Sequence, residues 1–204
     1  MDFIIVGEDI ATREIIKRLI SQYCSHAAIL REEPARGSEI QAQIRRYNML
    51  AESYPIFVLT DEDGECPPNK IQSWFGGDII APQMLFRVAV DEAESWLLAD
   101  HSGFSNYFRI ANEEIPLSAV RGNEKEVSFS IRYKTSLFIM LELVPKSRSA
   151  SVREQLTPRN RAHKGPAYNS AMVPFIINKW NPEMARQNSS SLDRAIIRLL
   201  EFCS

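Results

Sequence analysis

Acidic side chains follow three short apolar segments of the chain, and their types and spacing suit chemistry on phosphate groups. The apolar segments span 3–6, 56–59 and 85–90, and the acids behind them are Glu8 and Asp9, Asp61 to Asp63, and Asp91 to Glu94. Carboxylates held close together repel one another unless a cation is present. Their oxygens suit Mg²⁺ or Mn²⁺, and such an ion beside phosphate oxygens is the usual arrangement for phosphoryl transfer or phosphodiester cleavage.

A simpler interpretation places single acids at helix N-termini, where the helix dipole favours them. It accounts for Glu8, Asp9 and Asp91. It accounts poorly for Asp61 to Asp63, because that stretch leaves an apolar segment without an obvious helix start. The sequence therefore favours a metal site.

Other motifs with paired acids fit less well. An EF-hand loop opening at Asp61 would need Gly and Glu where the chain has Cys66 and Gln72. A haloacid-dehalogenase phosphatase carries its D-x-D after the first strand, whereas here it follows the third. A response-regulator receiver needs Thr or Ser at the end of its fourth strand and a later Lys-Pro, and neither is found here. Gly7 stands alone, so the Rossmann fingerprint is absent.

Alternating strands and helices would bring the acids together. Apolar runs predict strands at 3–6, 27–30, 56–59 and 85–90, and helical spacing of apolar residues predicts helices at 10–23, 38–52 and 91–99. This alternation predicts an α/β fold, a parallel Rossmann-like sheet covered by helices on both faces. Ligands of such sheets bind at the carboxyl ends of the strands, which is where the acids lie.

The two halves of the chain differ in charge. Residues 1–100 hold 17 acids and 9 bases, net −8, and residues 101–204 hold 9 acids and 15 bases, net +6. We expect one domain over 1–204, with an acidic α/β catalytic half at 1–100 and a basic loop and helical half at 101–204. In the second half, 135–144 fits a helix or a strand, 145–165 predicts a long polar loop, and 171–180 and 192–202 predict helices.

A basic segment, residues 146–164, is the candidate nucleic-acid interface. Glu154 is its only acid, and its bases are Lys146, Arg148, Arg153, Arg159, Arg161 and Lys164. Such a segment would contact a DNA or RNA backbone without reading its sequence. The alternative is a solvated loop, but an acidic edge that acts on phosphodiesters needs a polyanionic substrate, and that favours the interface. His163 and Tyr168 lie beside it.

The composition of the chain argues against several other classes of protein. Hydrophobic residues make up 45% and charged residues 25%, which is ordinary globular composition. No apolar run approaches the ~20 residues of a membrane span, so we expect no membrane partner. Cys24, Cys66 and Cys203 are few and far apart in the sequence, which argues against a disulfide scaffold or a cysteine zinc site and for a reducing cytoplasm.

The acid pattern resembles a Toprim catalytic domain. A Glu after the first strand, a D-x-D after a later strand and further acids after the next are carried by 4–8, 58–63 and 87–100. The chain is similar to small stand-alone Toprim-like proteins, which are akin to the nuclease half of OLD-family nucleases. One departure is that Gly7 precedes Glu8, whereas the usual Toprim Glu precedes its Gly. Residues 164–169 and 180–182 resemble the same proteins more loosely.

The resemblance implies a metal-dependent nuclease that uses Mg²⁺ or Mn²⁺. Glu8 would be a general acid/base or a metal ligand, and Asp61 and Asp63 would be metal ligands that take part in catalysis. Glu92 or Glu94 would complete a second metal position, with Glu94 also catalytic. The resemblance further implies frequent partnership with an ATPase in bacterial phage-defence loci, and homodimer formation stays open.

The same acids also fit a module without turnover. An acidic edge would then bind Mg²⁺ or the basic surface of a partner, as in a degenerate Toprim subunit or a receiver-like phosphoacceptor centred on Asp61. The departure at Glu8 weighs against the nuclease, and the missing Lys-Pro weighs against the receiver.

Overall fold

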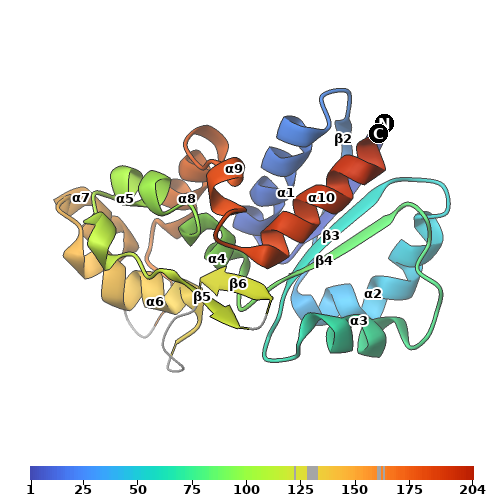
Figure 1. Cartoon of the computed structure of the whole chain (residues 1–204), viewed down its shortest axis with the longest axis horizontal. Coiled ribbons are helices and arrows are strands. Elements are labelled where there is room, and N and C mark those ends of the chain that lie inside the picture. Colours follow the sequence, from blue (N-terminus) through green and yellow to red (C-terminus); the bar gives the residue numbers. More distant parts are fainter. Residues whose placement is uncertain (122, 128–132, 160–161, 163) are drawn as a thin grey trace. The chain divides into compact units, whose positions relative to one another are not determined.

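The computed structural model describes residues 1–121, 123–127, 133–159, 162 and 164–204, and it confirms the predicted α/β fold (Figure 1). The chain divides into two compact units, Met1–Ala93 with Arg194–Ser204 and Glu94–Asp193. The first unit contains the predicted sheet. No helix in the described part of the chain is long and apolar enough to cross a membrane.

The sheet of the first unit has four parallel strands in the order β2-β1-β3-β4. They are β1 (Asp2–Gly7), β2 (Ala28–Pro34), β3 (Ile56–Asp61) and β4 (Met84–Ala89). The central strands β1 and β3 are apolar and buried, whereas β2, at one edge of the sheet, is polar and mostly exposed. Gly7 lies opposite Leu59, and Asp61 lies opposite Ala89. The residues that follow β1, β3 and β4 therefore share one edge of the sheet.

Helices cover both faces of this sheet. One face carries α1 (Ile10–Tyr23) and residues 194–203 of α10 (Ser190–Cys203), and the other carries α2 (Gly37–Leu50) and α3 (Pro67–Phe75) (Figure 1). The side chain of Asp9 caps α1 by accepting from the Thr12 amide at 2.8 Å. A single apolar cluster joins α2, α3 and the sheet face beneath them. The predicted layers are confirmed, and α3 is an element that the sequence analysis missed.

A disulfide joins Cys24, at the C-terminus of α1, to Cys203, at the end of α10. The Cα atoms are 5.7 Å apart although 179 positions separate the residues in the sequence. The sequence argued against a disulfide scaffold and for a reducing cytoplasm, and it did not predict this single pair, because distance along the chain says nothing about how α10 returns to the sheet. Cys66 is free and exposed.

The second unit is built from short elements. Its helices and turns are α4 (Ala93–Leu98, which starts at the boundary), α5 (His101–Phe108), η1 (Asn112–Glu114), α6 (Thr135–Phe138), η2 (Ile139–Leu143), η3 (Val144–Lys146), α7 (Ala150–Leu156), α8 (Tyr168–Asn178) and α9 (Pro182–Ala185). An antiparallel hairpin joins β5 (Ser118–Arg121) to β6 (Glu124–Val127). Phe104, Phe108 and Phe175 pack together in its core. The buried indole of Trp96 donates to Ser191 Oγ at 2.8 Å.

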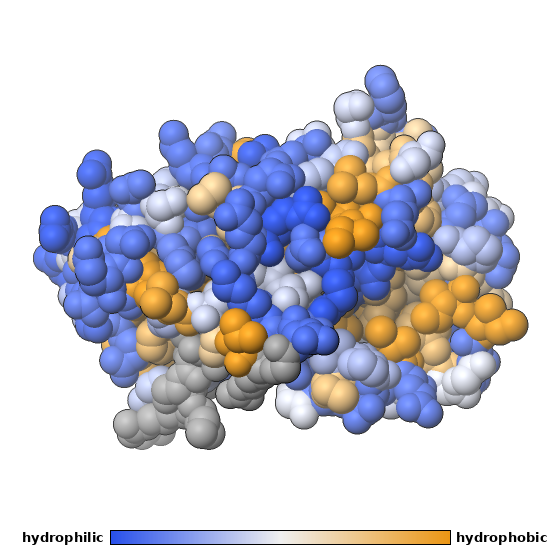
Figure 2. Space-filling view, in the orientation of Figure 1, coloured by the Kyte–Doolittle hydropathy of each residue, from blue (hydrophilic) through white to orange (hydrophobic). Residues whose placement is uncertain are grey.

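Exposed apolar side chains gather on the side of the first unit that carries α2 and α3 (Figure 2). Ile79 is 89% exposed and Met49 71% exposed, and Tyr54 and Ile80 are also exposed. The Asn48 side chain fixes the connection between α3 and β4, because its Nδ2 donates to Ile79 O and its Oδ1 accepts from the Ala81 amide. These residues form a fixed apolar surface.

Candidate functional site

Glu8 is the first residue after β1, and its carboxylate ties three elements together. Its Oε1 accepts from Thr60 Oγ1 at 2.5 Å and from the Asp61 amide at 3.1 Å, which links it to the end of β3. Both carboxylate oxygens lie 3.2 Å from the position that a Cβ on Gly37 would take, so Gly37, at the start of α2, lets the carboxylate approach. The order Gly7-Glu8 thus still places the acid at the sheet edge that the sequence analysis predicted.

Asp61 and Glu62 bind the backbone that follows β4. Asp61 Oδ1 accepts from the Ala93 amide at 2.9 Å, and Glu62 Oε2 accepts from the Asp91 amide at 2.9 Å. These acids therefore satisfy amides at and before the start of α4, across two neighbouring strands rather than within one. Helix capping, which the sequence analysis judged a poor account of this stretch, explains part of it.

Lys70 places a buried cation under the D-x-D loop. The residue is 3% exposed, and its Nζ donates to the carbonyl oxygen of Asp61 and to Asp63 Oδ2 at 3.2 Å. The ammonium also lies 4.9 Å from the ring centroid of Trp74. Lys70 belongs to α3, so the sequence analysis, which missed this helix, also missed the residue. The ammonium of Lys70 thus already compensates part of the negative charge of the D-x-D loop.

Strained backbone marks the two loops that carry acids. Asp63 has φ 53° and Asp91 has φ 66°, which is the left-handed region that side chains with a Cβ rarely adopt. Each such residue costs about 1–3 kcal/mol and persists where its surroundings hold it. Here Lys70 binds the side chain of Asp63, and Glu62 binds the amide of Asp91. Such strain clusters at functional sites, which supports a role for this edge.

The acids as arranged do not fit a divalent metal. Among the residues that the structure describes, no three Asp, Glu, His or Cys side chains are placed to hold an ion together. Two of the predicted ligands are engaged elsewhere, since Asp63 pairs with Lys70 and Asp61 Oδ1 accepts from a backbone amide. Glu92, a third predicted ligand, is buried at 9% exposure.

Glu94 belongs to the second unit and is committed to a cluster there. Its side chain is 7% exposed, and its Oε1 accepts from Lys164 Nζ at 2.9 Å and from the Tyr168 hydroxyl. The ammonium of Lys164 also lies 4.3 Å from the ring centroid of Tyr168. Lys164, a predicted nucleic-acid contact, therefore compensates a buried acid of its own unit.

The basic segment is not the long loop that the sequence analysis predicted, because it contains α7. Ser149 caps this helix by accepting from the Val152 amide at 3.3 Å. Lys146 pairs with the exposed Glu114 at 2.6 Å, and Arg153 donates to the carbonyl oxygen of Ser147.

The remaining bases of this segment are more open. Arg148 is exposed and lines a cleft of the second unit. Arg159 is exposed and donates to Glu154 O at 3.4 Å. Arg161 and His163 lie outside the described residues. Arg148 is therefore the predicted contact that the structure presents most directly.

Arg87 is a largely buried base inside β4. Burial, together with the nearby charges of Arg198 and Arg194, lowers its pKa to about 10, and Glu201 opposes this shift. One guanidinium nitrogen donates to the carbonyl oxygen of Phe86 at 3.1 Å. All three charged neighbours come from α10, so Arg87 lies toward that helix.

Comparison with protein-family models, with curated proteins and with solved structures finds no match.

Proposed function

We propose that this protein cleaves phosphodiester bonds of DNA or RNA, as a Toprim-type nuclease. The observation that carries the proposal is the junction at the carboxyl edge of the sheet, where the Glu8 carboxylate is bonded to Thr60 and to the amide of Asp61. The acid that follows β1 is thereby bonded to the end of the neighbouring parallel strand β3, where ligands of such sheets bind. The strained backbone of Asp63 and Asp91 beside the junction supports the proposal.

Glu8 is the proposed general base. Its Oε1 receives both hydrogen bonds, and Oε2 receives none from the residues that the structure describes. A carboxylate held by one oxygen keeps the other for the proton of an attacking water. Asp61 is held by the Ala93 amide and would position the reacting group. We derive no step through Mg²⁺ or Mn²⁺, because the acids do not fit an ion as they stand.

A second candidate is a module that binds without turnover. Lys70 favours it, because an ammonium that already neutralises the D-x-D loop reduces the need for another cation there. In that case the acidic edge would bind a basic surface of a partner protein. An ATPase partner in phage defence and a homodimer remain proposals under either candidate.

The test is cleavage of labelled DNA and RNA with EDTA, Mg²⁺ or Mn²⁺ by wild type, Glu8→Gln and Asp61→Asn. Both replacements keep the oxygen that accepts the hydrogen bonds of the junction, so the fold should survive. The matched control is Glu52→Gln, an exposed acid outside the junction. We expect a loss of roughly 10²-fold or more in rate for Glu8→Gln and no change for the control.

Two results would decide between the candidates. Equal cleavage by wild type and Glu8→Gln would refute the assignment of the base. Absence of cleavage by wild type under all conditions, together with acetyl phosphate labelling of Asp61 or capture of a basic partner, would favour the module.

A further inference from the structure

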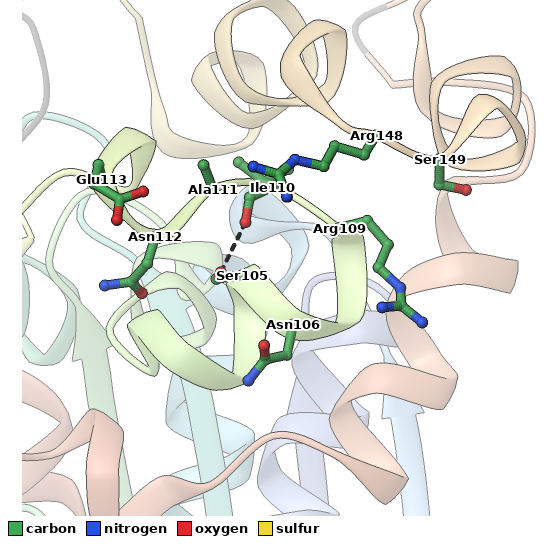
Figure 3. Close-up of a pocket in the computed structure, with 9 residues that line it drawn as sticks. All are labelled: Ser105, Asn106, Arg109, Ile110, Ala111, Asn112, Glu113, Arg148 and Ser149. Atoms are coloured by element: carbon green, nitrogen blue, oxygen red, sulfur yellow. Dashed lines mark hydrogen bonds between the residues drawn. The ribbon is translucent and has the colours of Figure 1, made fainter.

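A cleft of about 570 Å³ lies in the second unit between α5, the turn η1 and the residues before α7 (Figure 3). Its volume falls within the range of ligand sites, roughly 300–1,000 Å³. Two arginines, one glutamate and four neutral polar side chains line it, together with Ile110 and Ala111: Arg109, Arg148, Glu113, Ser105, Asn106, Asn112 and Ser149. The two arginines leave the cleft with a net positive charge in spite of Glu113. None of the lining residues belongs to the junction at the sheet edge.

The base of this cleft is held by backbone and hydroxyl hydrogen bonds. The amide of Arg148 donates to the carbonyl oxygen of Arg109 at 2.8 Å, and Ser147 Oγ donates to Phe108 O at 2.6 Å. Ser105 Oγ, which is buried, donates to Ile110 O at 2.7 Å (Figure 3). The end of α5 and residues 147–148 are thereby fixed to each other, so the two arginines start from fixed positions.

Arg109 is held in a conformation that a side chain with a Cβ rarely adopts. It ends α5 with φ 56° and ψ 38°, a position where Gly or Asn is usual. This left-handed conformation costs free energy, about 1–3 kcal/mol for a residue other than Gly. An arginine kept at a glycine position, on the wall of a cleft, indicates a use for its charge.

The two guanidinium groups are available and lie apart. Arg109 and Arg148 are both exposed, and no described acid forms an ion pair with either. The side chain of Arg148 extends across the cleft toward Ile110 and Ala111, whereas the side chain of Arg109 extends away from these two residues (Figure 3). The side-chain amides of Asn106 and Asn112 add further donors. This arrangement offers positive charge at two points instead of one.

We propose that the cleft binds the backbone of a single nucleic-acid strand, with Arg109 and Arg148 on different phosphates. If the ligand were one phosphate group, both guanidinium groups would point toward the same position. They diverge instead, which fits the separate phosphates along a strand. A cleft of small-molecule size admits one strand more readily than a duplex. Contacts of this kind hold a strand without reading its sequence. The inference rests on the proposed function for the identity of the polyanion.

The experiment measures binding of fluorescein-labelled oligo-dT and oligo-U by anisotropy in EDTA, across a series of salt concentrations. The proteins are wild type, Arg109→Gln, Arg148→Gln, the double variant and the control Arg46→Gln, an exposed arginine of α2 outside both the cleft and the basic segment. Circular dichroism melts check that each variant is folded. Inorganic pyrophosphate, added as a competitor, distinguishes a strand from a small phosphate ligand.

We expect each cleft variant to weaken binding about 3- to 10-fold at low salt. Each lost phosphate contact should reduce the slope of log K against log salt by about 0.7, so the double variant should lose about 1.4. The control should keep the wild-type affinity and slope. Pyrophosphate at concentrations comparable to the oligonucleotide should not displace it.

The proposal is overturned if wild type does not bind either oligonucleotide, if the folded double variant keeps the wild-type affinity and slope, or if the control Arg46→Gln loses as much. Displacement by an equal concentration of pyrophosphate would overturn the strand in favour of a small phosphate ligand. A protein that binds through the two arginines but never cleaves would keep this proposal while the nuclease fails. Cleavage that is indifferent to both arginines would refute this proposal alone.

Discussion

Reduction of the disulfide between Cys24 and Cys203 should destabilise the protein strongly. The bond closes a loop with a sequence separation of 179, which is most of the chain. The chain-entropy treatment of such a loop gives about 5 kcal/mol at 25 °C, and native disulfides commonly contribute about 2–4 kcal/mol. At about 2–4 °C per kcal/mol for a protein of this size, the melting temperature should fall by about 4–16 °C.

The assay is urea and thermal unfolding of the wild type, oxidised and reduced, with Cys203→Ser as a second route to the open form. Cys66→Ser is the control, because Cys66 is exposed and free. The bond also fixes α10 to the end of α1, where the ring of Phe202 packs 5.8 Å from that of Phe3. Amide exchange in residues 194–204 should therefore accelerate on reduction before global unfolding does.

Two measurements would refute this reasoning. Titration of the native oxidised protein should find one free thiol among the three cysteines, so a count of three would remove the premise. If oxidised and reduced wild type unfold at the same urea concentration, the loop closure contributes nothing measurable.

Three further predictions concern buried polar groups. Lys70→Met should lower the free energy of unfolding by about 1–3 kcal/mol, because Asp63 and the loop carbonyls lose their donor, and calorimetry should then detect tighter Mn²⁺ binding by the uncompensated loop. Tyr168→Phe should cost about 1–3 kcal/mol in urea melts, because the buried Glu94 loses a hydrogen bond. Burial, reinforced by a nearby lysine, lowers the pKa of His101 below its ordinary value of 6.5. Below about pH 6.5 the unfolded chain therefore binds a proton that the folded chain does not, so the free energy of unfolding should fall as the pH drops. The variant His101→Gln should flatten this pH dependence.

Controls for these variants come from exposed positions. Tyr54→Phe and His26→Gln change the same chemical groups at exposed sites, and we expect neither to alter stability or its pH dependence. Unchanged Mn²⁺ affinity in Lys70→Met would contradict the compensating role of that ammonium. A pH profile of His101→Gln that matches the wild type would show that another group titrates.

The sequence predicted the sheet well because its signals are local. The strands β1 and β3 are built around continuous apolar runs, β4 is apolar apart from Arg87, and α1 and α2 carry apolar residues at helical spacing. β2 extends to Pro34, four residues beyond its predicted end. The apolar pattern missed 31–34 because these residues are polar and lie at the exposed edge of the sheet. Pairing with β1 extends this strand, and the apolar pattern alone does not record that pairing.

Helix α3 shows why part of the site was missed. Its first residues are Pro67 and Pro68, which indicate a turn when read alone but suit the first turn of a helix. Because the sequence pattern did not predict that helix, it could not place Lys70 beside the D-x-D loop. The partner of Glu94 was equally hidden, because Lys164 is 70 positions away in the sequence. Arg109 gave no signal, since its left-handed backbone becomes visible only in the structure.

The first unit is discontinuous, since residues 194–204 complete it after the whole second unit has intervened. During synthesis, about 100 residues separate the two parts, which takes about 5–20 s at the usual rate of 5–20 residues per second. During that time the sheet face that α10 covers in the folded protein, including Phe3, is not yet covered by α10 on the nascent chain. The second unit is synthesised during this interval. The first unit begins first along the chain but can be completed only after residues 194–204 have followed the second unit.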